Sequence, residues 1–256
     1  MTQASARSEP AAADMMLGAL LAMSPGEQAR LLGDPDRAAP WVEAAAEAGV
    51  ASAQLRHGRW LLERGQHAAA LSLFQRAARR GDADAQNMVG RCLENGWGVE
   101  PDPRRAARWF ARAARAGHAW AQYNLGHLSL DGLGVPRDLA AAYGWYLEAA
   151  RQGHARAMNL AARCLEEGWG VRPDHDAARD WLRRSAEAGY FRGQYNFATV
   201  LAAEQRLEQA ARLFAAALAG APEQTRSRMA ETLAARPEPA LNRLGRTAQA
   251  GAAPCC

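Results

Sequence analysis

The sequence contains no lysine, and all 31 of its basic residues are arginine. The planar guanidinium suits two-point contacts with carboxylates and phosphates. A general bias toward Ala, Arg and Gly would give the same composition, so the arginines alone do not define a ligand. The formal net charge is only +4, and the arginines are interleaved with Asp and Glu. Nucleic-acid binders gather positive charge on one face or in runs, so we expect no nucleic-acid partner.

Strand-favouring residues are sparse and cysteine is rare, whereas alanine is abundant and 49% of the residues are apolar. This balance favours helices with a sizeable core. Four cysteines at these positions do not form a disulfide framework: Cys92, Cys164, Cys255 and Cys256. The final Cys-Cys resembles the prenylation site of some small GTPases, but that protein context is missing. A reactive thiol pair and an incidental chain end both stay open.

Long apolar runs are also missing. The longest early run, MMLGALLAM at residues 15–23, follows Asp14. It is too short to cross a bilayer and poorly flanked for a signal peptide. We therefore expect a cytoplasmic protein with no membrane partner.

One short loop recurs at a fixed interval. The sequence reads GWGV at 96–99, GLGV at 132–135 and GWGV at 168–171, so each loop begins 36 residues after the last. Full units of this length begin at Gly81, Gly117 and Gly153, and shorter ones begin at Gly49 and Gly189. Self-similarity at such a period is typical of repeat architectures.

Each unit has the pattern helix, loop, helix. Apolar residues recur at helical spacing, and glycines such as Gly96 and Gly98 permit the backbone angles that end a helix. An Asp then stands where an N-cap is expected, at Asp102, Asp138 or Asp174. We expect the recurring tryptophans to anchor the core through the second helix: Trp109, Trp145 and Trp181. One hairpin cannot bury its own apolar stripe but stacked neighbours can, which predicts an all-α, right-handed α-solenoid.

The same pattern sets the expected boundaries. We predict a disordered N-terminus at 1–13, capping helices at 14–48, repeats at 49–220, a C-terminal capping helix at 221–236 and a flexible tail at 237–256. Within the first cap, Ser24 is a predicted N-cap and Pro40 is predicted to open a short helix.

The units resemble the Sel1-like repeat, a relative of the tetratricopeptide repeat that is common in bacteria. The second unit carries the family pattern at Ala121, Leu125, Gly126, Gly132, Gly134, Val135, Asp138, Ala142, Trp145, Tyr146, Ala149, Ala150 and Gly153. The resemblance spans about residues 41–220. It implies a non-catalytic adaptor that binds partner proteins. Some secreted members carry disulfides within a repeat. Here Cys92 and Cys164 occupy equivalent positions two repeats apart, too far for a bond, so we expect buried thiols.

The resemblance also implies that each first helix lines a concave groove. One row of groove positions then holds Arg59, Arg91, His127, Arg163 and Thr199. A row four residues earlier holds Leu55, Asn87, Tyr123, Asn159 and Tyr195, and residues four apart share a helix face. These side chains suit a protein or peptide ligand, including an acidic one. A merely solvated groove is the alternative, with Arg91 and Arg163 paired internally to Glu94 and Glu166.

Signs of catalysis are missing from the sequence. It contains no P-loop, dinucleotide fingerprint, HExxH or GxSxG, and we expect neither a cofactor nor a metal. His118 and His154 share one repeat position, for which a two-histidine metal site and an inherited turn residue are the alternatives. An enzyme or enzyme subunit acting on a cell-wall or secreted target, and a self-associating structural subunit, remain alternative functions.

Overall fold

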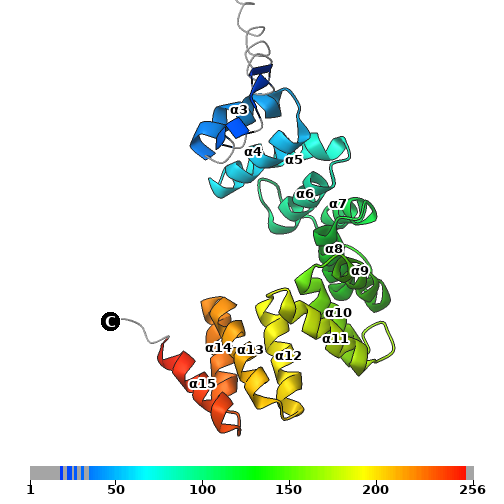
Figure 1. Ribbon diagram of the computed structural model, residues 1–256. Helices are drawn as coiled ribbons and strands as arrows, with labels where there is room; N and C mark the ends of the chain where they lie inside the picture. The colour runs from blue at the N-terminus through cyan, green and yellow to red at the C-terminus, as the bar shows by residue number, and fades with distance from the viewer. Residues whose placement is uncertain (1–17, 20–21, 25, 28–29, 32–34, 252–256) are drawn as a thin grey trace, which may run out of the picture. The chain divides into compact units, whose positions relative to one another are not determined.

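A computed structural model describes residues 18–19, 22–24, 26–27, 30–31 and 35–251 of the chain. This part of the chain contains helices and no strand, which confirms the all-α prediction. Its thirteen helices (Figure 1) are α3 (Pro35–Glu47), α4 (Ala51–Glu63), α5 (His67–Arg79), α6 (Ala83–Asn95), α7 (Pro103–Arg115), α8 (Ala119–Asp131), α9 (Leu139–Arg151), α10 (Ala155–Glu167), α11 (His175–Glu187), α12 (Phe191–Ala203), α13 (Leu207–Gly220), α14 (Glu223–Ala234) and α15 (Pro239–Ala250). None of these described helices is both long and apolar enough to cross a bilayer.

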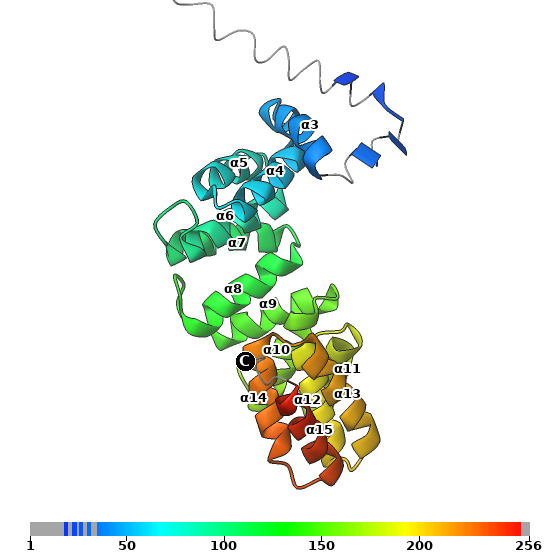
Figure 2. The same ribbon diagram turned by 90° about the vertical axis from the view of Figure 1, so that its left-hand side faces the viewer.

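The chain divides into two compact units. Unit 1 comprises residues 1–121 and 132–136, and unit 2 comprises residues 122–131 and 137–256. In unit 1 the hairpins α4–α5 and α6–α7 stack through contact of α5 with α6. In unit 2 the hairpins α10–α11, α12–α13 and α14–α15 follow one another, and each packs on the next (Figure 2).

Helix ends lie where the repeat pattern predicts them. The carboxylates of Asp102, Asp138 and Asp174 each accept a hydrogen bond from the backbone N–H three residues on, at 2.9 Å. Gly96 and Gly168 end α6 and α10 in the left-handed conformation, with φ of 73° and 69°. The predicted N-caps and glycine stops are therefore confirmed.

The second glycine of each loop has a further structural role. A Cβ added to Gly170 would lie 2.2 Å from the backbone of Leu139, at the start of α9. Gly134 lies against Pro103, and Gly98 lies against the start of α5, in the same way. The loop therefore docks on the second helix of the preceding hairpin, and only a residue without a side chain permits this approach.

The centre of each hairpin pairs an aromatic ring with a glycine. Phe74, Phe110 and Tyr146 are fully buried. Added Cβ atoms on Gly58, Gly90 and Gly126 would lie 2.5, 2.6 and 2.6 Å from those three rings, respectively. Large and small side chains thus interlock across the two helices, as close-packed cores require.

The prediction that the recurring tryptophans anchor the core is only partly correct: Trp181 packs against a core cluster, but none of the three is fully buried. Trp109, Trp145 and Trp181 are only half-buried, whereas the residues that follow them are the fully buried ones: Phe110, Tyr146 and Leu182. Arg112 and Arg184 stack on the Trp109 and Trp181 rings at 4.7 and 4.9 Å. Successive helical positions differ by about 100°, so the tryptophan falls at the edge of the apolar stripe and the next residue at its centre.

The expectations for the N-terminal region are partly correct. Ser24 forms a capping box with Glu27: the Glu27 backbone N–H donates to Ser24 Oγ, and Ser24 N–H donates to Glu27 Oε2 at 2.9 Å. Pro40 does not open a helix, because α3 already begins at Pro35 and contains Pro40. The predicted disordered segment 1–13 lies outside the described residues.

The expectation of a flexible tail from residue 237 is wrong over most of its length. Residues 239–250 form α15, which packs on α13 and α14. Leu241 is fully buried, and Gly245 lies against the backbone of α14. The Pro and Gly content suggested a loop, but Pro239 occupies the first helical turn, where proline is favoured, and Gly245 permits close packing.

Candidate partner-binding groove

Unit 2 contains a groove of about 610 Å³ across the first helices of its hairpins. The described residues that line it are Tyr123, His127, Arg156, Asn159, Leu160, Arg163, Glu166, Glu167, Tyr190, Arg192, Tyr195, Asn196, Thr199, Val200, Thr225 and Met229. Six of the sequence-predicted positions meet here: Tyr123, His127, Asn159, Arg163, Tyr195 and Thr199. The two rows come together because each pair is four residues apart on α8, α10 or α12, which places both members on one face.

Aromatic rings form one part of the groove wall. Tyr123 and His127 meet edge to face, with ring centres 4.6 Å apart, and the His154 ring lies 4.9 Å from Tyr123. Burial raises the pKa of Tyr123 and lowers the pKa of His127, although Asp131 opposes the latter change. The phenol and the imidazole are therefore neutral at pH 7 and act as hydrogen-bonding groups.

Two amides form the floor. Asn159 is only 6% exposed, and its Oδ1 accepts a hydrogen bond from Asn196 Nδ2 at 2.8 Å. This bond links α10 to α12 and orients both side chains. The bond leaves Asn159 Nδ2 as a donor and Asn196 Oδ1 as an acceptor, and both residues line the groove. A donor and an acceptor are the two groups that a peptide backbone requires.

Arg163 stands beside these amides, and its guanidinium lies 4.6 Å from the centre of the Trp169 ring. Arg91 stacks in the same way on Trp97, at 5.1 Å. Neither arginine is within ion-pair distance of Glu166 or Glu94 among the described residues, so the predicted alternative of internal pairing is not observed. Burial raises the pKa of both carboxyl groups, and the neighbouring arginine opposes that shift.

The other predicted positions lie in unit 1 and do not belong to this groove. They are Leu55, Arg59, Asn87 and Arg91. Asn87 is 6% exposed. Arg59 is engaged by its own chain, because its Nη2 lies 3.7 Å from Asp84 Oδ1.

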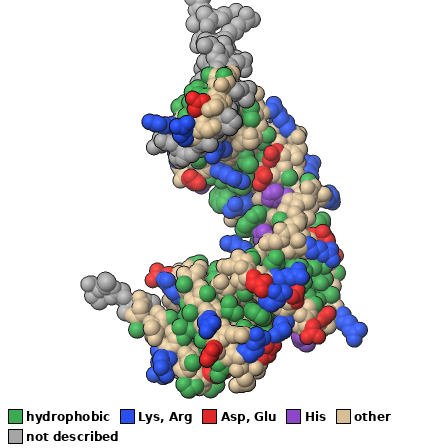
Figure 3. Space-filling model, in the orientation of Figure 1, with side chains coloured by type: hydrophobic (Ala, Val, Ile, Leu, Met, Phe, Trp, Pro, Cys, Tyr) green, Lys and Arg blue, Asp and Glu red, His purple; other side chains and the backbone are tan. Residues whose placement is uncertain are grey.

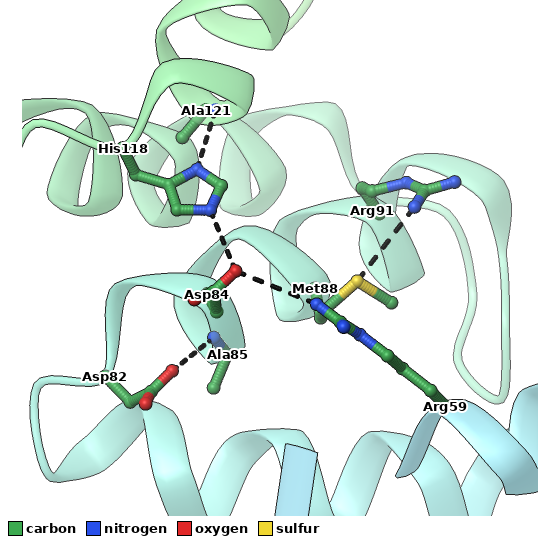
Figure 4. A network of polar contacts seen from close by, with 8 residues as sticks. All are labelled: Arg59, Asp82, Asp84, Ala85, Met88, Arg91, His118 and Ala121. Atoms are coloured by element: carbon green, nitrogen blue, oxygen red, sulfur yellow. Dashed lines mark hydrogen bonds and ion pairs between the residues drawn. The ribbon is translucent and has the colours of Figure 1, made fainter. Parts of the chain in front are cut away.

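Figure 4 shows Asp84 between Arg59 and His118. His118 Nε2 lies 3.1 Å from Asp84 Oδ1, while its Nδ1 accepts a hydrogen bond from the Ala121 N–H. Both contacts fit a neutral imidazole that carries its proton on Nε2. His154 accepts a bond from Ala157 N–H at the equivalent place. These two histidines recur because each caps a first helix. No metal-binding cluster of His, Cys, Asp or Glu occurs in the described part of the chain.

Sequence reasoning missed six charged or polar residues of the groove: Arg156, Glu167, Tyr190, Arg192, Asn196 and Thr225. Arg156 and Arg192 lie one turn before the predicted row on α10 and α12, so a third row at that spacing would have found them. On the face seen in Figure 3, arginines lie among acidic and apolar side chains, as the interleaved sequence indicates.

The repeat geometry agrees with a known family. The model of the Sel1 repeat matches residues 11–50, 51–82, 83–118, 121–154 and 155–190. The chain belongs to the Sel1 repeat family. Helices α12 to α15 follow the last matched residue.

Solved Sel1 structures resemble this chain over most of its length. A Sel1 repeat protein from Oxalobacter formigenes is 25% identical, with a TM-score of 0.68, over 81% of this chain and 84% of its own. A protective antigen of uropathogenic Escherichia coli with an SLR fold is 23% identical, with a TM-score of 0.68, over 95% of this chain. This chain spans about half (53%) of that antigen. A comparison with curated protein sequences gives no match. The neighbours support a Sel1/TPR-like solenoid of helical hairpins.

Proposed function

We propose that this Sel1 repeat protein is a non-catalytic adaptor that binds an extended segment of a partner protein in the groove of unit 2. The observation that carries the proposal is the hydrogen-bonded amide pair Asn159–Asn196. Both residues line the groove and keep one donor and one acceptor beyond their own bond. Sel1 repeat solenoids commonly serve as scaffolds for protein interaction. The cytoplasmic location stays a prediction.

The side chains around the amides favour a peptide over a small metabolite. The groove is open and crosses four helices, α8, α10, α12 and α14. Tyr123, Tyr190 and Tyr195 give rigid contact area, and Arg156, Arg163 and Arg192 offer guanidinium groups to acidic side chains. A segment that crosses several helices gains many small contacts, which is how repeat surfaces bind.

The test is selection of binding peptides from a random displayed library on the full chain. The selected peptides are then measured against two charge reversals at equivalent repeat positions, Arg163→Glu in the groove and Arg91→Glu outside it. Both remove a guanidinium that stacks on a loop tryptophan, so they are matched in this structural contact. We expect Arg163→Glu to weaken binding by about tenfold or more and Arg91→Glu to change it by less than about twofold.

Equal effects of the two reversals would place the binding site elsewhere and refute the proposal. Asn196→Ala gives an independent reading, because it removes the candidate acceptor and the hydrogen bond that orients Asn159. Circular dichroism of each variant checks that the helices are retained.

A further inference from the structure

We infer that the groove selects a partner strand whose side chains alternate between acidic and basic. This inference rests on the proposed function, and it adds the charge pattern and orientation of the ligand. The structure supports it through two opposite charged edges and a floor that orients a backbone between them.

The first edge is basic and consists of Arg156 and Arg192. Both line the groove near the N-terminal ends of α10 and α12. The guanidinium of Arg156 lies 5.8 Å from the centre of the Tyr190 ring. The positive charges of both arginines oppose the rise that burial causes in the pKa of the neighbouring Tyr123 hydroxyl. The two cations therefore share one side of the groove.

The second edge is acidic and consists of Glu166 and Glu167, at the C-terminal end of α10. The ten residues from Arg156 to Glu166 correspond to about 15 Å along the helix axis. Arg163 lies between the edges, held over Trp169. Among the ion pairs of the described residues, none includes Arg192, Glu166 or Glu167, so these charges are available to a ligand.

The floor decides how a strand lies. In an extended chain the N–H and C=O of one residue point the same way, and those of the next residue point the opposite way. In the proposed pose, the acceptor Asn196 Oδ1 and the donor Asn159 Nδ2 bind the N–H and C=O of a single residue that faces the floor. A backbone held in this way directs its side chains sideways, because side chains stand perpendicular to the hydrogen-bonding direction.

Successive side chains then reach opposite edges. One set meets Arg156 and Arg192, and the alternate set meets Glu166 and Glu167. Acidic residues suit the first edge and basic residues the second, while like charges in contact repel. A strand with acid and base in alternation satisfies both edges, whereas a purely acidic strand satisfies only one.

The first experiment compares two end-blocked octapeptides of identical composition by fluorescence polarisation with the full chain. One alternates Glu and Lys, and the other has all its Glu before all its Lys. We expect the alternating peptide to bind about tenfold more tightly, a modest factor because exposed ion pairs are individually weak.

The second experiment reverses the edges. The double variant Arg156→Glu, Arg192→Glu makes both edges acidic, and we expect it to lose the preference for the alternating peptide. Adding Glu166→Arg and Glu167→Arg exchanges the edges, which restores the preference because an alternating strand can shift by one residue. Arg104→Glu with Arg105→Glu, exposed in unit 1, makes the same change in net charge and serves as the control.

The outcomes separate the two proposals. Equal binding of the octapeptides, no binding of either, or no restoration by the edge exchange overturns the inference. If library peptides still bind in an Arg163-dependent way, the proposed function stands without it. If no library peptide depends on Arg163, both proposals fail.

Discussion

At the scale of single residues, glycine is decisive where it lies against a ring. Gly126 faces the fully buried Tyr146, whereas Gly144, in the partner helix of the same hairpin, has no heavy atom within 4 Å of an added Cβ. Both positions are glycines inside a helix, so a Gly→Ala substitution changes helix propensity equally at both. Any difference between the two substitutions therefore reports the packing against the ring.

We expect Gly126→Ala to lower the free energy of unfolding by about 1–3 kcal/mol, because the buried ring cannot move away from the new methyl group. Gly144→Ala is expected to raise it by about 0.5–1 kcal/mol through helix propensity. Urea denaturation measures both. Similar shifts in the two variants would contradict the interlocked core.

The two repeat cysteines are free and buried, as predicted. Cys92 and Cys164 are at most 1% exposed, and burial raises the pKa of each thiol to about 11. Because the thiolate is the reactive form, a raised pKa means less thiolate at every pH below it.

In a variant with Cys255 and Cys256 changed to Ser, we expect the native protein to react with a thiol-specific disulfide reagent at least about 100-fold more slowly than the urea-unfolded protein near pH 8. The absorbance of the released thiolate gives both rates. Fast reaction of the folded variant would show that these thiols are reachable.

At the scale of elements, the repeated loop joins neighbouring hairpins. Gly153 and Gly170 both have positive φ, 87° and 71°, but only Gly170 lies against a neighbouring backbone. Gly153 has no heavy atom within 4 Å of an added Cβ. Comparing substitutions at these two glycines distinguishes the energetic cost of the left-handed backbone conformation from the cost of displacing the loop from α9.

We expect Gly153→Ala to cost about 1–2 kcal/mol, the price of a left-handed alanine. Gly170→Ala should cost about 1–3 kcal/mol more, because the methyl group forces the loop away from α9. Thermal and urea unfolding of both variants test this difference. If the two substitutions are equally costly, the loop is only a helix stop.

At the scale of the whole molecule, stability in a solenoid is a sum of local contacts. Helix α15 contacts α13 and α14, and Leu241 belongs to a core shared with Phe214 and Leu233. A destabilising substitution in α15 should therefore lower the stability of the last hairpins more than that of the first ones.

We expect Leu241→Ala to destabilise its surroundings by about 2–5 kcal/mol. In hydrogen exchange, amides of α12 to α15 should lose protection while those of α4 to α7 keep theirs. A uniform loss along the chain would mean that the repeats unfold as one cooperative body. Leu133→Ala, at an exposed leucine, is the control.

The sequence by itself determined the period, the helix pairs and their caps, because these depend on local spacing and on backbone chemistry within one repeat. The two groove rows stay a prediction. Asp102 caps its helix for reasons contained in a few neighbouring residues. The tertiary structure alone decided which side chains share a surface. It joined Asn159 to Asn196, engaged Arg59 with Asp84, and added Arg192 and Glu167 to the groove. It also made a helix of residues 239–250, because the burial of Leu241 depends on partners that local sequence does not name.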